Sequence, residues 1–94
     1  MESVRFSNIC TMEYFDHSTK SVFYVDIIYD LKEHAYDAWL YADMYGIKEH
    51  MFGLPVHNYD CGKPYTETIE SVIETVEACL PNHIEYYANK HMSN

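Results

Sequence analysis

Basic residues are scarce in this sequence of 94 residues, which has six lysines and arginines against fifteen aspartates and glutamates. The six are scattered singly, so the chain lacks the cationic patch that binding to nucleic-acid phosphates requires. Glycine and proline are also rare, with three of each, and neither a linker nor a repeat interrupts the sequence. We therefore expect residues 1–94 to form a single compact domain.

Long apolar runs are absent as well, and no segment approaches the ~20 residues that a membrane span needs. The N-terminus lacks the basic and apolar regions of a secretory signal. The number of cysteines, three, is odd, so a full set of disulfides would leave one thiol over. We expect a cytoplasmic protein without membrane contact. Its 48% hydrophobic content excludes a disordered chain despite the net charge of −9.

The first thirty residues have the composition of β-strands. Ser21 to Tyr29 is rich in β-branched and aromatic residues, and the segment from Phe15 to Lys20 before it is typical of a turn. This pattern predicts an antiparallel hairpin over about 3–29. Because an isolated hairpin is only marginally stable, it must pack on helices or gain a strand from a second copy of the chain. A homodimer is therefore an open alternative.

Helical patterns follow the hairpin. Apolar residues recur at spacings of three and four over 31–45, and Asp30 with Glu33 has the spacing of a capping box. A second apolar stripe predicts a helix over 66–80 that ends at Pro81, and a short helix is expected over 83–92. Residues 47–64 are expected to be an irregular loop. The predicted class is α+β, with the N-terminal hairpin packed on two or three helices.

Acidic residues are concentrated on the expected helices. One row on the second helix is formed by Glu67, Glu70, Glu74 and Glu77. A second row, on the first helix, is formed by Asp30, Glu33 and Asp37, with Tyr36 and Tyr41 at its rim. Carboxylates on successive helical turns lie ~5–6 Å apart, close to the ~7 Å between phosphates along a nucleic-acid strand. These nine residues are the predicted partner-binding surface, which would occupy a basic groove. A face that is charged only for solubility is the alternative.

Motifs of catalysis are absent: the sequence contains neither a Gly-rich phosphate loop, nor Gly-x-Ser-x-Gly, nor His-Glu-x-x-His. We therefore expect a non-enzymatic, tyrosine-rich interaction module. In size, acidity and lack of an enzymatic motif, the chain resembles the small acidic phage and mobile-element proteins that inhibit host defence nucleases, the anti-CRISPR proteins among them. This resemblance implies that the partner is a basic nucleic-acid-handling protein of the host. It assigns no site residues.

Two alternative functions come from the second half of the chain. His57, Cys61, Cys79 and His83 form two close pairs of nitrogen and sulfur ligands, which is the donor set of a structural zinc site. Zinc is thus the alternative to the expected absence of a cofactor, in a small domain held together by the metal. The other alternative is a small-ligand or enzymatic role for the loop 47–64 at a dimer interface.

Overall fold

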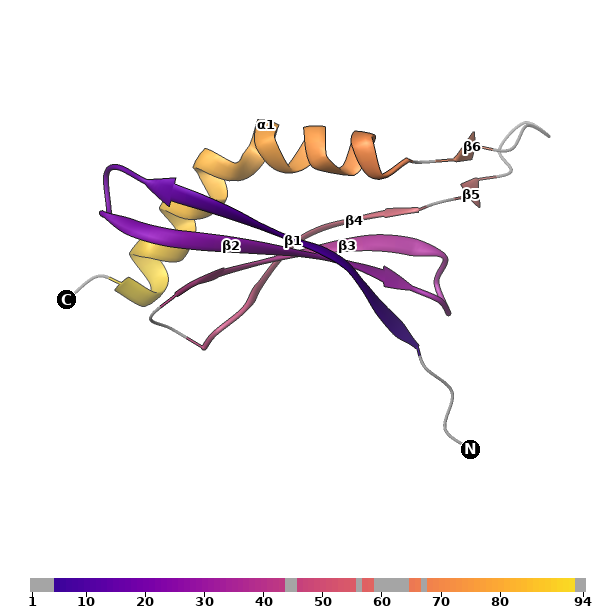
Figure 1. Ribbon diagram of the computed structural model, residues 1–94, viewed down its shortest axis with the longest axis horizontal. Helices are drawn as coiled ribbons and strands as arrows, with labels where there is room; N and C mark the ends of the chain where they lie inside the picture. Colours follow the sequence, from indigo (N-terminus) through magenta and orange to yellow (C-terminus); the bar gives the residue numbers. More distant parts are fainter. Residues whose placement is uncertain (1–4, 44–45, 56, 59–64, 67, 93–94) are drawn as a thin grey trace.

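A computed structural model describes residues 5–43, 46–55, 57–58, 65–66 and 68–92. Four strands form one antiparallel sheet in the order of the chain: β1 (Phe6–Asp16), β2 (Ser21–Asp30), β3 (Ala35–Ala42) and β4 (Glu49–Pro55). The two-residue strands β5 (His57–Asn58) and β6 (Tyr65–Thr66) pair separately. The helix α1 (Ile69–Tyr87) follows and continues into a π-helical segment, η2 (Ala88–Met92). In Figure 1, α1 runs along one face of the sheet.

The N-terminal hairpin has the position expected from the sequence. Strands β1 and β2 pair antiparallel from Asp16 opposite Ser21 to Phe6 opposite Asp30. Their turn is closed by the Asp16 carboxylate, which accepts hydrogen bonds from the Thr19 backbone N–H (2.9 Å) and hydroxyl (2.7 Å). The register shifts between Asn8 and Cys10, which is a β-bulge that bends the strand.

The expected helix over 31–45 was wrong, because residues 31–34 form a turn and residues 35–42 form β3. Asp30 does act as a cap: its Oδ1 accepts hydrogen bonds from the backbone N–H groups of Lys32 (2.9 Å) and Glu33 (3.2 Å). His34 then adopts a φ of 53°, which turns the chain back toward β2 instead of into a helix. Along β3, the buried residues recur at the period of two.

The expected helices over 66–80 and 83–92 were also wrong as separate elements, because α1 passes through Pro81. Thr68 is its N-cap, and the Thr68 side chain accepts a hydrogen bond from the Ser71 N–H (3.3 Å). Proline inside a helix removes one hydrogen bond and bends the axis, and the ribbon of α1 changes direction along its length (Figure 1). The helix continues because its buried row crosses the proline: Val72, Val76, Leu80, Ile84 and Tyr87.

The expected loop over 47–64 contains β4, which pairs antiparallel with β3. The hairpin therefore gains its further strands, β3 and β4, from the same chain. Residues 59–64 lie outside the described part of the chain. The class remains α+β, with a four-stranded sheet and one α-helix in place of a hairpin and two or three helices.

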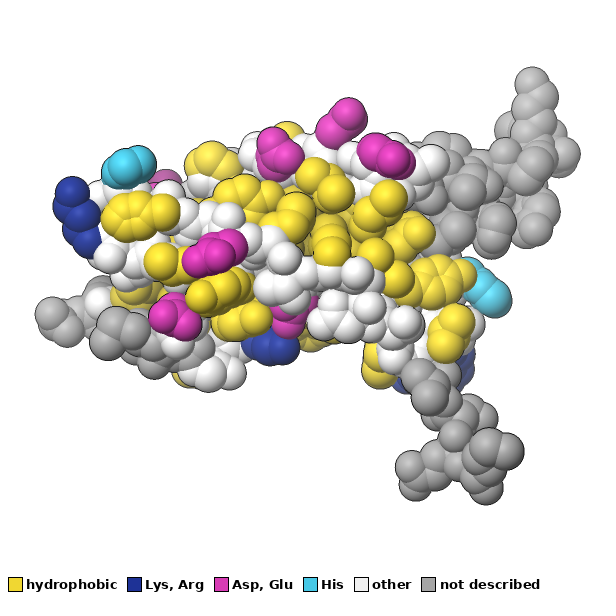
Figure 2. All heavy atoms as spheres, viewed as in Figure 1, with side chains coloured by type: hydrophobic (Ala, Val, Ile, Leu, Met, Phe, Trp, Pro, Cys, Tyr) yellow, Lys and Arg dark blue, Asp and Glu magenta, His cyan; other side chains and the backbone are white. Residues whose placement is uncertain are grey.

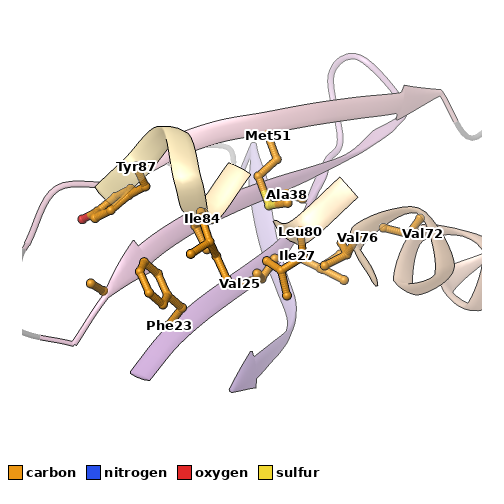
Figure 3. Packing of buried hydrophobic residues seen from close by; sticks show 12 residues of the cluster. Phe23, Val25, Ile27, Ala38, Met51, Val72, Val76, Leu80, Ile84 and Tyr87 are labelled. Atoms are coloured by element: carbon orange, nitrogen blue, oxygen red, sulfur yellow. The ribbon is translucent and has the colours of Figure 1, made fainter. Parts of the chain in front are cut away.

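The hydrophobic core lies between α1 and one face of the sheet (Figure 3). The sheet contributes Phe23, Val25, Ile27, Ala38, Leu40, Ala42 and Met51, and the helix contributes its buried row. Tyr87 anchors the end of α1: its ring packs edge-on against Phe23 at 5.7 Å between centroids, and its hydroxyl donates a 2.7 Å hydrogen bond to the Ile47 carbonyl. The core thus involves one face of the sheet, and the other face carries the polar side chains around Asp26.

Candidate protein-interaction site

The acidic row of α1 lies on the surface. Glu70, Glu74 and Glu77 are exposed, on turns whose opposite sides carry the buried row. Among the described residues, the ion pairs lie elsewhere, and these three carboxylates take part in none of them. Glu67, the fourth predicted member of the row, lies outside the described residues. The "acidic row" below means Glu70, Glu74 and Glu77.

An apolar strip lies beside the acidic row. It consists of half-buried side chains from the edge strand and from the first turns of the helix: Cys10, Met12, Tyr14, Ile69 and Ile73. Burial and the negative charge of Glu77 both raise the pKa of the Tyr14 hydroxyl, so the strip and the acidic row are neighbours. Figure 2 shows acidic side chains of α1 standing above a broad apolar surface. The two features together form one amphipathic surface.

The second predicted acidic row does not exist as a helical face. Asp30 ends β2, Glu33 lies exposed in the following turn, and Asp37 lies within β3. Asp30 is only 4% exposed and forms an ion pair with Arg5 (3.2 Å). The hydrogen bond from Arg5 lowers the pKa of this carboxyl group. Asp30 therefore ties Arg5 and the turn after β2 to the end of that strand.

Asp37 is held by the neighbouring strand. Its Oδ1 lies 3.0 Å from the Nε2 atom of His50 on β4. A Cβ atom added at Gly53 would come within 2.8 Å of the same oxygen, so glycine makes room for the carboxylate. Asp37 is accordingly part of the β3–β4 pairing.

Tyr36 and Tyr41 lie on opposite faces of the sheet, since five residues separate them on one strand. Tyr36 packs edge-on against Tyr29, with 5.4 Å between ring centroids. Tyr41 stacks on Tyr24 at 5.3 Å on the face opposite α1. The two tyrosines thus do not share a rim.

A polar network on the face opposite α1 escaped the sequence analysis. Asp26 is 4% exposed, and its carboxylate accepts hydrogen bonds from the side chains of Lys48 (2.8 Å), Thr11 (2.7 Å) and Tyr41 (3.3 Å). Lys48 also lies over the Tyr41 ring, 4.9 Å from its centroid. Alternation of Val25 and Ile27 around Asp26 was the available signal, because it places the aspartate on the other side of a strand.

The alternative zinc ligands are only partly described. Cys79 and His83 are one helical turn apart on α1, whereas the side chain of His57 and all of Cys61 lie outside the described residues. Cys79 packs against the core, and burial raises the pKa of its thiol, which opposes the thiolate that a metal needs. In the described part of the chain, no group of three or more metal-binding side chains occurs.

A cleft of about 300 Å³ relates to the alternative small-ligand role. It lies between the start of β4 and the second half of α1, and its lining is Leu40, Glu49, His50, Asn82, His83 and Tyr86. The carboxylate in this cleft belongs to Glu49, which forms ion pairs with Lys90 (2.8 Å) and His91 (2.7 Å). Hydrogen bonds from both residues lower the pKa of Glu49. The carboxylate is thus neutralised by the chain itself.

Comparison with protein families, curated proteins and solved structures gave no match for this chain. No helix among the described residues is long and apolar enough to cross a membrane. The inference of function therefore depends on the surfaces themselves.

Proposed function

We propose that this protein is a small, non-enzymatic interaction module of the cytoplasm that binds a basic, nucleic-acid-handling protein and blocks its nucleic-acid groove. In size, acidity and lack of an enzymatic motif it resembles the small acidic inhibitors of host defence nucleases carried by phages and mobile elements, such as the anti-CRISPR proteins. The acidic row of α1 is the contact surface.

The observation that carries the proposal is the uncompensated charge of the acidic row. Like charges three or four residues apart destabilise a helix, so the arrangement has a cost within the isolated protein. A basic partner would reverse that cost, because its cations would lie opposite the carboxylates. Such a surface also accelerates association with a basic protein through long-range attraction.

The distribution of the basic side chains supports the same conclusion. Arg5 pairs with Asp30, Lys48 with Asp26 and Lys90 with Glu49. These cations neutralise carboxylates of the sheet and leave the acidic row to dominate its side of the molecule. A face kept charged only for solubility usually mixes both signs.

Charge reversal with a matched control tests the proposal. Immobilised wild-type protein, the variant Glu70→Lys/Glu74→Lys and the control Glu33→Lys/Asp43→Lys would be incubated with host lysate and eluted with a salt gradient. Both variants change the net charge equally, but the control changes exposed residues that are not part of α1. The captured protein would then be tested for displacement of its labelled nucleic acid.

We expect the wild type and the control to capture a nucleic-acid-handling protein from the lysate. Each should also displace the labelled nucleic acid from that captured protein. The helix variant should retain little of it. Equal retention by both variants, or nucleic acid that stays bound in the presence of the module, would contradict the proposal.

A further inference from the structure

We propose that the partner contributes a strand to the free edge of β1, and that this strand carries lysine or arginine on the side facing α1. The proposal rests on the proposed function, and it specifies how the basic partner is held. The strand would extend the sheet beyond Cys10–Asp16 and lie beneath the acidic row. Three independent features of the structure lead to this inference.

The first feature is the open edge itself. β1 is the outermost strand, and in the described part of the chain no other strand pairs with its outer side. It is eleven residues long, and after the irregularity at Ile9 the pairing with β2 runs without a break from Cys10 to Asp16. An edge strand exposes backbone N–H and C=O groups that can hydrogen-bond to an added strand. Figure 1 shows β1 in front of the sheet with its edge uncovered.

The opposite edge is protected in ways that β1 is not. β4 has seven residues, a register irregularity within its pairing, and Pro55 at its end, and α1 packs close to it. Proline, lysine and a covering helix are the usual means of blocking an edge. β1 contains neither proline nor lysine, and its bulge at Ile9 interrupts only its first part. The sheet is thus open to strand addition at one edge.

The second feature is the apolar strip. The side chains of Cys10, Met12 and Tyr14 point toward the α1 side of the sheet but are only half-buried, because no fifth strand covers their outer flank. Side chains of an added strand would lie ~4.5–5.5 Å from them. The aliphatic stems of lysine or arginine can cover such a surface while their charged ends reach beyond it.

The third feature is the charge that borders the strip. Figure 2 shows the acidic side chains of α1 bordering a broad apolar surface, and Glu77 lies close enough to Tyr14 on β1 to raise the pKa of its hydroxyl. From Glu70 to Glu77 the helix rises ~10 Å, and side chains on one face of a strand repeat every ~7 Å. Two successive lysines on that face, ~7 Å apart, therefore fit within the ~10 Å length of the row.

The same charge disfavours a second copy of this chain at the edge. Each chain carries a net charge of −9, and a symmetric pairing of two β1 strands would bring the two acidic rows to one side of the joined sheet. Like charges across an interface oppose association. A basic strand would pair with the backbone groups of the edge, cover the apolar strip and place its cations opposite the acidic row.

The test uses the full chain and a defined peptide. The probe is a capped nine-residue peptide that alternates lysine with valine, and the control peptide has glutamate in place of each lysine. Amide hydrogen exchange of the isotope-labelled protein would be followed by NMR with and without each peptide. We expect slower exchange at alternating amides between Cys10 and Asp16 with the lysine peptide only.

Variants separate the contribution of charge from that of the edge. Glu70→Lys/Glu74→Lys should weaken binding of the lysine peptide about tenfold at low salt, as two exposed ion pairs would predict, and Glu33→Lys/Asp43→Lys should leave it within about twofold. Met12→Lys places a cation in the strip and should abolish the protection of β1. The native spectrum of each variant shows whether its fold is intact.

Three results would overturn the proposal. Peptide binding that changes α1 without protecting β1 amides would show a purely electrostatic contact, in which case the proposed function could still hold. Protection of β1 in the free protein, with a dimeric mass in solution, would show that a second copy occupies the edge. Equal protection of the β1 amides by the lysine and glutamate peptides would show that the acidic row takes no part in the interaction.

Discussion

Asp26 is a buried carboxylate in a protein whose other acidic groups are mostly exposed. Burial tends to raise its pKa, but hydrogen bonds from Lys48, Thr11 and Tyr41 outweigh this effect, so the pKa lies below the usual value. An aspartate with a lowered pKa in the folded state stabilises that state above its unfolded pKa of about 4. This stabilisation is lost as the pH falls through the folded pKa.

We predict that Asp26→Asn lowers the free energy of unfolding by about 1–3 kcal/mol at pH 7. The neutral amide cannot form the ion pair with Lys48. Because the Lys48 side chain is half-exposed, solvent screens this ion pair, and the loss of stability is moderate. Urea denaturation at pH 7 and at pH 3 would measure the effect, with the exposed Glu13→Gln as the control. The difference between the wild type and Asp26→Asn should shrink at pH 3, and a pH-independent difference would contradict the role of the charge.

Local signals in the sequence predicted a helix over 31–45 where the structure has a turn and a strand, because each of these signals fits both. Asp30 caps the N–H groups of Lys32 and Glu33 as a capping box would, yet the same hydrogen bonds also close a turn between strands. Three alanines over 35–42 fit the spacing of a helix. Ala38 and Ala42 equally fit a strand, because Leu40 lies between them on the same buried face. Only the pairing of β3 with β2 and β4 decides between these periods.

The acidic row was predicted from spacing alone, because a helix of known register fixes which residues share a face. Its neighbour, the apolar strip, could not be predicted. The strip joins a strand and a helix separated by more than fifty residues of sequence, and its existence depends on how α1 lies across the sheet. The end of the helix was predicted wrongly at Pro81. Proline usually ends a helix, but here the buried row continues past it to Tyr87, and the packing of that row keeps the chain helical.

At the scale of the helix, we predict that Glu74→Lys raises the free energy of unfolding by about 0.5–1 kcal/mol. Glu74 is four residues from Glu70 and three from Glu77, so the substitution replaces two repulsions with two attractions of a few tenths of a kcal/mol each. Thermal unfolding at 20 mM and 1 M salt would test this, with the neutral Glu74→Gln expected to give about half the gain. A gain that persists in 1 M salt, or a loss of stability, would refute the electrostatic origin.

The same substitution is expected to weaken binding to a basic partner, so stability and binding should change in opposite directions. A residue retained only for solubility would show no such opposition. This contrast distinguishes a binding surface from a solvated face without knowledge of the partner, because the lysine-rich peptide serves as the probe. It also explains why a helix would keep like charges at a cost to its own stability.

At the scale of the whole molecule, the formal net charge of −9 counts the six histidines as neutral. Protonation of all six at low pH would bring the formal charge to −3. We predict that the association rate constant with the lysine peptide is lower at pH 5 than at pH 8 in 20 mM salt, as stopped-flow fluorescence of a labelled peptide would measure.

The salt dependence identifies the cause of this pH effect. In 1 M salt the screening length falls to about 3 Å, and the difference between the two pH values should disappear. Equal rates at pH 5 and pH 8 in low salt would mean that the field of the molecule does not guide association. Recognition would then depend on the edge of β1 and the apolar strip alone.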